Sequence, residues 1–323
     1  MSDPKKHHYV PQVYLQRFAM NQSGDLITIK VKANPGKKAK PKKKNKSQVC
    51  YSRHEYRYQT AYYLNMAGTI DPNIIEKKAF AYENTRLTSL FDKIDRNKKL
   101  NRSQTEELIK ILIHLKKRNP VFRQYYQDFK DFNNLIRSVI NEYKFPPELQ
   151  DLPEDFKQRC LGVASKILSD NYKQKEYRND LHRSTLHGNN PGVEESKKNF
   201  IQRLLNWDIT VFRTDPTIPF ITCDNPGFTC KRPFNITNTN FDYIDFFAFP
   251  LYPTSLIHFS KPTHTPSNKL LIQPPIKYRK ASPSTVLLFN LGTMVNASSL
   301  VFSASEDQLI IALKFLKSHG KFT

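Results

Sequence analysis

The stretch "DLITIKVK", residues 25–32, alternates apolar and polar side chains. An alternation with a period of two residues is typical of a β-strand that buries one face. The preceding residues 21–24, Asn-Gln-Ser-Gly, are typical of a turn. The sequence therefore predicts a strand close to the N-terminus, and the fold depends on which other strands this one joins.

A run of lysines follows the predicted strand. The stretch "KKAKPKKKNK", residues 37–46, has seven lysines in ten positions. Its proline and the repulsion between like charges predict a flexible loop rather than a helix. Such a loop either stays solvated or binds phosphate groups, and the sequence leaves both possibilities open.

The middle of the chain carries helical patterns. Asp71-Pro72 marks a predicted helix start, and apolar residues recur at helical spacing through residues 73–97. Glu83 falls on that apolar face, where a carboxylate needs a partner such as Arg86 or Arg118.

Further helices follow in the sequence. Ser103 and Glu106 resemble a capping box that opens a helix, which should end or kink before Pro120. The next helical segments are predicted from about residue 122 to 143, and over 154–175 and 193–206.

After Trp207 the pattern changes to short β-segments. These are "WDITVFRTD", "PFITCDNPGF", "FDYIDFFAFPLYP" and "SLIHFS". Residues 285–305 predict a helix running into a strand, and residues 306–320 predict an amphipathic helix that ends at Gly320.

This order of elements predicts an α+β protein. We expect an N-terminal β element and a C-terminal antiparallel sheet, joined to each other, with a central helical bundle. The chain is predicted to be one domain over residues 1–323. Its parts are 1–70 with the N-terminal motif, strand and basic loop, 71–206 with the helices, and 207–323 with the β-rich region and the C-terminal helices.

Charge favours an anionic partner. The chain has 51 Lys+Arg against 29 Asp+Glu, a formal net charge of +22. RNA, DNA or an anionic surface would be attracted by such a field, although the lysine content could also reflect an AT-rich coding bias.

Other classes of protein are disfavoured. No apolar run approaches the ~18 residues that would span a membrane, and the basic N-terminus lacks a signal-peptide core, so we expect a cytoplasmic protein without a membrane partner. The four cysteines form no Cys-x-x-Cys pair, which argues against a structural zinc site. There is no Gly-rich phosphate loop, Gly-x-Ser-x-Gly elbow or His-Glu-x-x-His helix.

The N-terminal stretch "KKHHYVPQVYLQRF", residues 5–18, holds the sharpest chemical signal. His7 and His8 should point to opposite sides of an extended backbone, so at most one enters a given site. An imidazole can transfer protons near neutral pH or bind a metal, or it can simply order the terminus at a sheet edge. A helix is expected from about Gln12, with Val13, Tyr14 and Phe18 facing inward.

A second polar signal lies near a predicted strand end. Asp224 and Asn225 precede Pro226, which favours extended backbone just past the strand. The pair could belong to a functional site or to an ordinary Asx turn. Asn290 and Asn296 lie six residues apart, about 600° around a helix, so at most one should share that site.

Several segments together resemble a known family of uncharacterised prokaryotic proteins. "HHYVPQVYLQRF" and "NQSGDLITIKVK" resemble its first two elements, and "EKKAFAYENTRLTSLFDKI" is similar to its helix with an inward glutamate, here Glu83. "HLKKRNPVFR" resembles its helix end with an arginine before proline, here Arg118. "FITCDNPGF" resembles a serine-aspartate-x-proline segment, with Cys223 where serine is common.

"FFAFPLYP" and "LLFNLGTMVNASSLVFS" resemble the last two segments of the same family, which is called domain-of-unknown-function family 4238. The resemblance extends from about residue 5 to 305, and the lysine run is not part of it. It implies candidate positions but no established reaction.

Two functional hypotheses follow. The first is a nuclease of a bacterial defence or toxin system, acting on RNA in preference to DNA, with His7 or His8 as general base or metal ligand. Asp224 and Glu83 would be metal ligands or proton-transfer partners and could hold Mg²⁺ or another divalent cation. The second hypothesis is a non-catalytic nucleic-acid-binding module.

The two hypotheses share one set of candidate contacts. Gln12, Asn225 and Asn290 are further candidate site residues. Cationic side chains would bind the phosphate charge: Lys5, Lys6, Arg17, Lys37, Lys38, Lys42, Lys43, Lys44 and Arg118.

Overall fold

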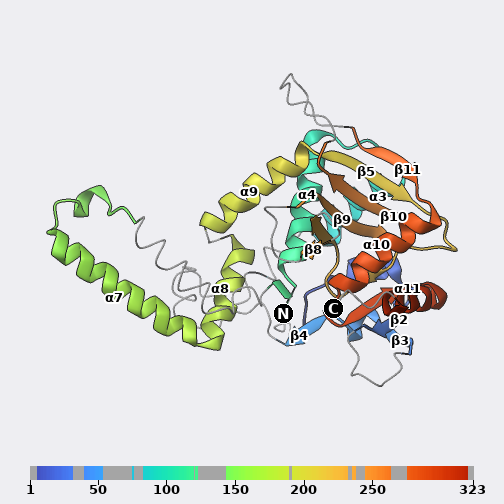
Figure 1. The fold of residues 1–323 in the computed structure, drawn as a ribbon, viewed down its shortest axis with the longest axis horizontal. Coiled ribbons are helices and arrows are strands. Elements are labelled where there is room, and N and C mark those ends of the chain that lie inside the picture. Colours follow the sequence, from blue (N-terminus) through green and yellow to red (C-terminus); the bar gives the residue numbers. More distant parts are fainter. Residues whose placement is uncertain are drawn as a thin grey trace.

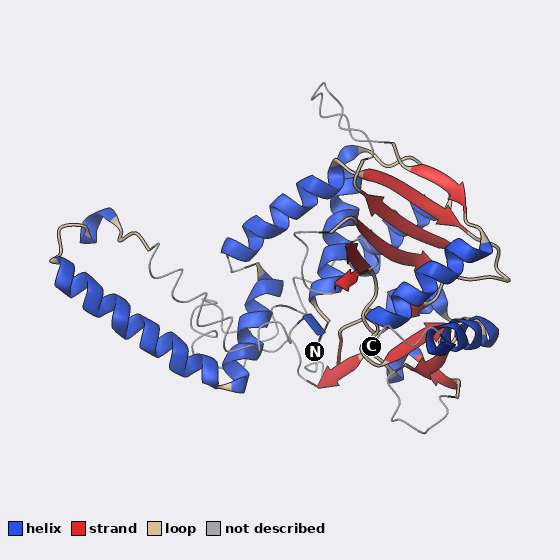
Figure 2. Cartoon of the chain, in the orientation of Figure 1, coloured by secondary structure: helices blue, strands red, loops and turns tan. Residues whose placement is uncertain are grey.

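A computed structural model of the chain describes residues 6–31, 40–53, 75, 83–119, 121–122, 143–188, 191–231, 235–237, 244–262 and 275–318. Helices and strands occur together in these residues, so the chain has the predicted α+β fold (Figure 2). The predicted helix start at Asp71-Pro72 and the helical segment 123–142 lie outside the described residues.

The N-terminal strand joins the C-terminal part of the chain. β2 (Asp25–Lys30) lies between β3 (Lys42–Asn45) and β12 (Leu300–Ser303), and β6 (Thr222–Cys223) completes an antiparallel sheet in the order β3-β2-β12-β6. The expected junction of the two β regions is therefore confirmed.

β2 is more deeply buried than its alternating pattern predicts. Ile27 and Ile29 pack with Val301 and with Leu309 of α11 (Glu306–Ser318). Leu26, on the other face, belongs to the main core. Both faces are covered because the sheet lies between α11 and the rest of the molecule.

A second sheet holds most of the remaining strands. Its order is β11-β5-β10-β9-β7-β8, and it is antiparallel apart from the β11–β5 pair. These strands are β5 (Asp208–Arg213), β7 (Phe228–Lys231), β8 (Asn235–Thr237), β9 (Phe246–Tyr252), β10 (Ser255–Ser260) and β11 (Lys277–Lys280).

Aromatic side chains fill both faces of this sheet. Phe247, Phe249 and Phe259 belong to the main core. Phe228 of β7 packs against Phe289 of α10 (Pro283–Asn296), which crosses the other face (Figure 1). The strands are short, and large rings supply much of the buried area.

The helices of the middle region lie beside the second sheet and extend away from it (Figure 1). They follow the chain order η4 (Glu83–Leu87), α3 (Thr88–Asp95), α4 (Arg102–Lys117), η6 (Pro147–Leu149), α7 (Glu154–Lys173), α8 (Lys175–His187) and α9 (Pro191–Leu205). None of the described helices is long and apolar enough to cross a membrane.

The start of α4 differs from the prediction at Ser103 and Glu106. The N-cap is Asn101, whose side chain accepts a hydrogen bond from the Gln104 backbone at 2.9 Å. The Gln104 side chain accepts one from the Asn101 backbone at 3.3 Å. Asn caps a helix as well as Ser does, so the box forms two residues earlier than predicted.

The N-terminal motif adopts the expected extended-then-helical path. β1 (Lys6–His8) pairs with β4 (Tyr51–Arg53), and α1 (Gln12–Leu15) continues into η1 (Gln16–Phe18). Tyr14 and Phe18 are fully buried. The Tyr14 hydroxyl contacts Thr222 at 2.7 Å and donates to the Pro250 carbonyl at 2.9 Å, so α1 links the two larger sheets.

The lysine run is not a flexible loop over its second half. Residues 42–45 form β3 at the edge of the first sheet, and η2 (Lys46–Gln48) follows. Lysine is a common residue on edge strands because its charge opposes pairing with another chain. Residues 37–39 lie outside the described part of the chain.

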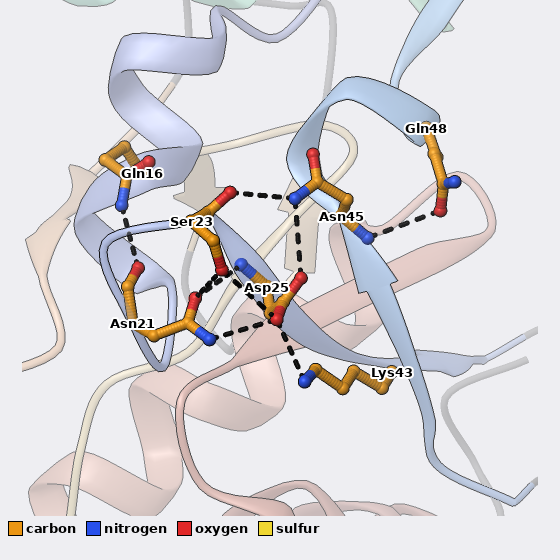
Figure 3. Close-up of polar contacts among 7 residues, drawn as sticks. All are labelled: Gln16, Asn21, Ser23, Asp25, Lys43, Asn45 and Gln48. Atoms are coloured by element: carbon orange, nitrogen blue, oxygen red, sulfur yellow. Dashed lines mark hydrogen bonds and ion pairs between the residues drawn. The ribbon is translucent and has the colours of Figure 1, made fainter.

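A polar network around Asp25 holds this strand in place (Figure 3). The Asp25 carboxylate accepts hydrogen bonds from Asn21 at 3.0 Å, Lys43 at 2.9 Å and Asn45 at 3.4 Å. These contacts lower the pKa of the Asp25 carboxyl, with the Asn21 hydrogen bond the largest cause. These contacts hold the strand in one conformation although its lysines repel one another.

We expect Asp25→Asn to lower Tm at pH 7. Because the folded-state pKa of Asp25 is lowered, its stabilisation is present above the unfolded pKa of about 3.9 and is lost as the pH falls through the folded pKa. The difference in Tm between the two proteins should therefore shrink below about pH 4. Asp208→Asn, which removes an ion pair with Lys277 at 3.1 Å, is the control and should change Tm less. Equal shifts for both variants at every pH would contradict the assignment.

Candidate functional site

His8 lies where β1, α1 and the end of α4 meet. Its side chain is half-buried, and its Nε2 atom lies 2.8 Å from the Gln12 amide nitrogen. An amide nitrogen can only donate, so the ring nitrogen is the acceptor in this contact. Arg118, 2% exposed, donates to the His8 carbonyl oxygen. The histidine is thus ordered from both its side chain and its backbone.

Asp224 orders a loop. Its side chain is 2% exposed, and its oxygens accept hydrogen bonds from the backbone of Ser298 at 2.8 Å, Ser299 at 2.8 Å and Leu300 at 2.9 Å. These charge-assisted contacts fix the connection between α10 and β12. They support a structural role, and the predicted role as a metal ligand stays a prediction.

A buried lysine connects α4 to the residues that follow Asp224. The Lys116 ammonium donates to Asn225 Oδ1 at 2.8 Å, the Gly227 carbonyl at 2.7 Å and Asn296 Oδ1 at 3.2 Å. The side chain is 1% exposed. Three oxygen acceptors match the three N–H groups of an ammonium ion.

Burial lowers the pKa of Lys116 to about 7, and the smaller effects of Cys223 and Asp224 oppose this shift. The three acceptors stabilise the charged form in a place where an unpaired ammonium would be costly. Lys116 therefore connects α4 to the turn after Asp224 and to the end of α10.

The turn at residues 224–227 is tightly constrained. Asn119 donates to the Asp224 carbonyl, and the two amides of Asn225 and Asn296 bond to each other's backbone at 2.9 and 2.6 Å. Gly227 has φ +73°, and a Cβ there would lie 2.3 Å from the ring of Phe249. Only glycine fits this position without a shift of the ring.

Two buried thiols adjoin the turn. Cys223 donates to the Asn225 carbonyl at 3.1 Å, and burial raises its pKa to about 12. Burial also raises the pKa of Cys50, and the nearby charge of Asp224 adds to that shift. Both groups are protonated at neutral pH, which argues against either as a nucleophile.

Cations gather at the C-terminal end of α4, beside α8 and α9. Burial lowers the pKa of Lys117 to about 8 and that of His114 to about 3, and the charge of Lys197 contributes to both shifts. The His182 ring lies 2.8 Å from the Lys117 carbonyl oxygen. Asp180 and Arg183 form a buried ion pair at 2.5 Å. Cations are favoured near a helix C-terminus, and their density would also attract an anion.

The predicted site residues do not all come together. The structure brings His8, Gln12 and Arg118 into contact on one side, and Asp224 and Asn225 into the turn on the other.

Asn290 lies elsewhere, where its amide bonds the Ile221 backbone at 3.0 Å and the Pro219 carbonyl at 3.0 Å. Arg17 bonds Asp92 at 3.0 Å and covers the Tyr252 ring, so it anchors α1. Some predicted site residues lie outside the described part of the chain: Lys5, Lys37 and Lys38, and the side chains of Lys6, His7 and Glu83.

Arg86, one of the two partners predicted for Glu83, bonds Glu107 at 2.8 Å on the surface. Because the side chain of Glu83 lies outside the described residues, its pairing stays a prediction.

Sequence reasoning missed Lys116, which bonds Asn225 and Asn296, and His182, whose ring lies against the Lys117 carbonyl. The run "HLKKRN" at the end of α4 was a usable signal, because three basic residues in one turn cannot all avoid the core. The residues of α8 show no repeating apolar side chains at helical spacing. No helix was therefore predicted around His182.

Chemically, the site combines an ordered imidazole with cations that are held by acceptors inside the protein, three oxygens around Lys116 and the Asp180 carboxylate beside Arg183. Within the described residues, no group of three or more His, Cys, Asp and Glu side chains could hold a metal.

We expect Lys116→Met to lower the free energy of unfolding by about 3 kcal/mol, because it leaves buried oxygens without their charged donor. Lys110→Met is the matched control on the same helix. Lys110 is exposed and bonds Glu106 at 2.5 Å, so its loss should cost under about 1 kcal/mol. Urea unfolding of both variants measures the difference, and equal small losses would show that Lys116 is not a connector.

Comparison with known proteins gives one match. A family model described as a protein of unknown function, DUF4238, matches residues 6–307. No curated protein and no solved structure gave a match. Since the family model covers nearly the whole chain, including the His8 strand and the 224–227 turn, the chain belongs to the DUF4238 family.

Proposed function

We propose that the protein binds nucleic acid, RNA in preference to DNA, through a basic surface built on β3. The observation that carries this proposal is the ordered lysine strand at the edge of the first sheet. A fixed row of cations loses less conformational entropy on binding than a flexible loop would. The net charge of +22 supplies the attraction at longer range.

The lysine strand lies close in the chain to the His8 strand. β3 leads through η2 and residues 49–50 to β4, and β4 pairs with β1. Lys46 of η2 also bonds the side chain of Gln16 at the end of α1. A polyanion bound along β3 would therefore continue toward His8, and a cytoplasmic location would give the protein access to RNA.

We expect replacement of Lys40, Lys42 and Lys44 by Gln to weaken binding to single-stranded RNA. The slope of log K against log salt should fall by about 2, at about 0.7 per phosphate contact. Lys43 is kept because it bonds Asp25. Fluorescence anisotropy over a salt series, with unlabelled DNA as competitor, gives both the slope and the RNA preference.

The control removes the same charge elsewhere, at the exposed positions Lys99, Lys314 and Lys317. It should leave the slope nearly unchanged. A slope that changes equally in both triple variants would assign binding to net charge alone and exclude β3 as the binding surface.

A second candidate function is RNA cleavage, and the ordered His8 ring favours it. In this mechanism His8 takes the proton of a ribose 2′-hydroxyl, the 2′-oxygen attacks phosphorus, and the 5′-oxygen leaves with a proton from a general acid or water. The products are a 2′,3′-cyclic phosphate and a 5′-hydroxyl end. Arg118 would stabilise charge on the phosphate. Such an activity would fit a bacterial defence or toxin system.

If His8 is the base, His8→Ala should lower the cleavage rate by about 10²- to 10⁴-fold with binding retained. Gln12→Ala should have a smaller effect, since it only frees the ring. His187→Ala, at a half-buried histidine of α8, is the control. Assays with labelled RNA, with and without a chelator, also test the metal-dependent alternative. Cleavage that persists in His8→Ala would exclude this mechanism and leave the binding function.

A further inference from the structure

α7 differs from the other long helices in how little of it is buried. Of its 20 residues only Tyr172 is buried. The helix extends away from both sheets (Figure 1). A helix of this length covers about 30 Å and rarely persists without a packing surface.

An apolar stripe runs along this exposed helix. Phe156 is 46% exposed, Val163 59% and Ile167 55%, and Cys160 is exposed between them. The spacing of these four residues is four, three, four, which is the spacing of the contact positions in paired helices. Gly162, on another face of the helix, also has nothing within 4 Å of an added Cβ.

The charge of α7 also sets it apart. It carries three acidic and four basic residues, a net +1 within a chain of net charge +22. A nearly neutral face with an apolar centre suits contact with protein rather than with a polyanion. Self-association through this helix avoids the repulsion between the basic parts of two copies.

The charged residues along one side of the apolar stripe indicate which partner fits it. By the rotation of about 100° per residue, Asp155, Arg159, Asp170 and Lys173 lie along one flank. In an antiparallel pair this flank faces the same flank of the other copy. Asp155 then lies opposite Lys173 of the second copy, and Arg159 opposite its Asp170.

A parallel pair fits less well. There the same flank would face the opposite one, and Arg159 would lie near Lys157 of the second copy. Arg159 and Asp155 already bond within the helix at 2.5 Å, and Lys173 and Asp170 at 2.8 Å, so these side chains need little rearrangement to share their partners.

We propose that α7 forms an antiparallel helix pair with α7 of a second copy of this chain.

Val163→Glu tests the proposal, because it places two carboxylates near the twofold axis. We expect the dissociation constant of the full-length dimer to rise at least tenfold in sedimentation experiments over a concentration series. Gln158→Glu is the matched control, since it adds the same charge to the exposed opposite face of α7. Circular dichroism checks that both variants are folded.

Chemical cross-linking gives a second readout. Cys160 is exposed, while Cys50, Cys223 and Cys230 are buried. In the proposed register the two Cys160 residues lie about 12 Å apart along the axis, within reach of a bismaleimide with a hexyl spacer. We expect a cross-linked dimer that disappears in Cys160→Ser and in Val163→Glu.

A charge reversal tests the direction of pairing. Asp155→Lys should weaken the dimer, and Asp155→Lys combined with Lys173→Asp should restore it. A chain that is monomeric at all concentrations, or a dimer that Val163→Glu leaves intact, would overturn the proposal. Failure of the double variant to restore the dimer would overturn the antiparallel arrangement.

Discussion

The ammonium of Lys116 connects three parts of the molecule that are far apart in the sequence. It lies at the end of α4 and donates to the turn at residues 225–227 and to Asn296 at the end of α10. Because the group is buried, its hydrogen bonds must all be made inside the protein. The positions of the helical region, the second sheet and α10 are coupled through this one charge, and the candidate site is built beside it.

The site around this lysine divides into two kinds of polar group. Asp224, Asn225 and Asn296 are committed to backbone and to one another, which keeps the turn rigid. His8 is half-buried on β1, which pairs with β4, and its Nε2 atom contacts the Gln12 amide. Rigid placement of an imidazole is what proton transfer requires. The buried thiols and carboxylate belong to the support.

The sequence predicted the order of elements well where local pattern decides structure. The period-two alternation of residues 25–30 and the β-segments after Trp207 identified strands, and the N-terminal and C-terminal β regions join as expected. Local pattern could not show that residues 42–45 pair as a strand, because the partners of Lys43 and Asn45 lie in the preceding turn and strand. α8 was missed for a related reason. Most of its buried residues are polar, among them Asn179, Asp180, His182 and Arg183, so the helix shows no apolar period.

The candidate site was predictable only in part. His8, Asp224 and Asn225 carry recognisable motifs, and the structure gives each of them specific contacts. Lys116 is marked only by its place in the basic run HLKKRN, and its role depends on contacts across 109 to 180 positions of the sequence. Tertiary contacts of this range are set by packing rather than by local propensity.

The position of β2 between β3 and β12 has a consequence for synthesis on the ribosome. Ile29 pairs opposite Val301, 272 positions later in the chain. At about 5–20 residues per second, β2 waits roughly 15–50 s for this neighbour, with an apolar strand edge exposed. β3 follows about a dozen residues later and can pair with the other edge soon after synthesis. The lysine-rich hairpin would then keep the nascent N-terminal region soluble until the last third of the chain closes the sheet.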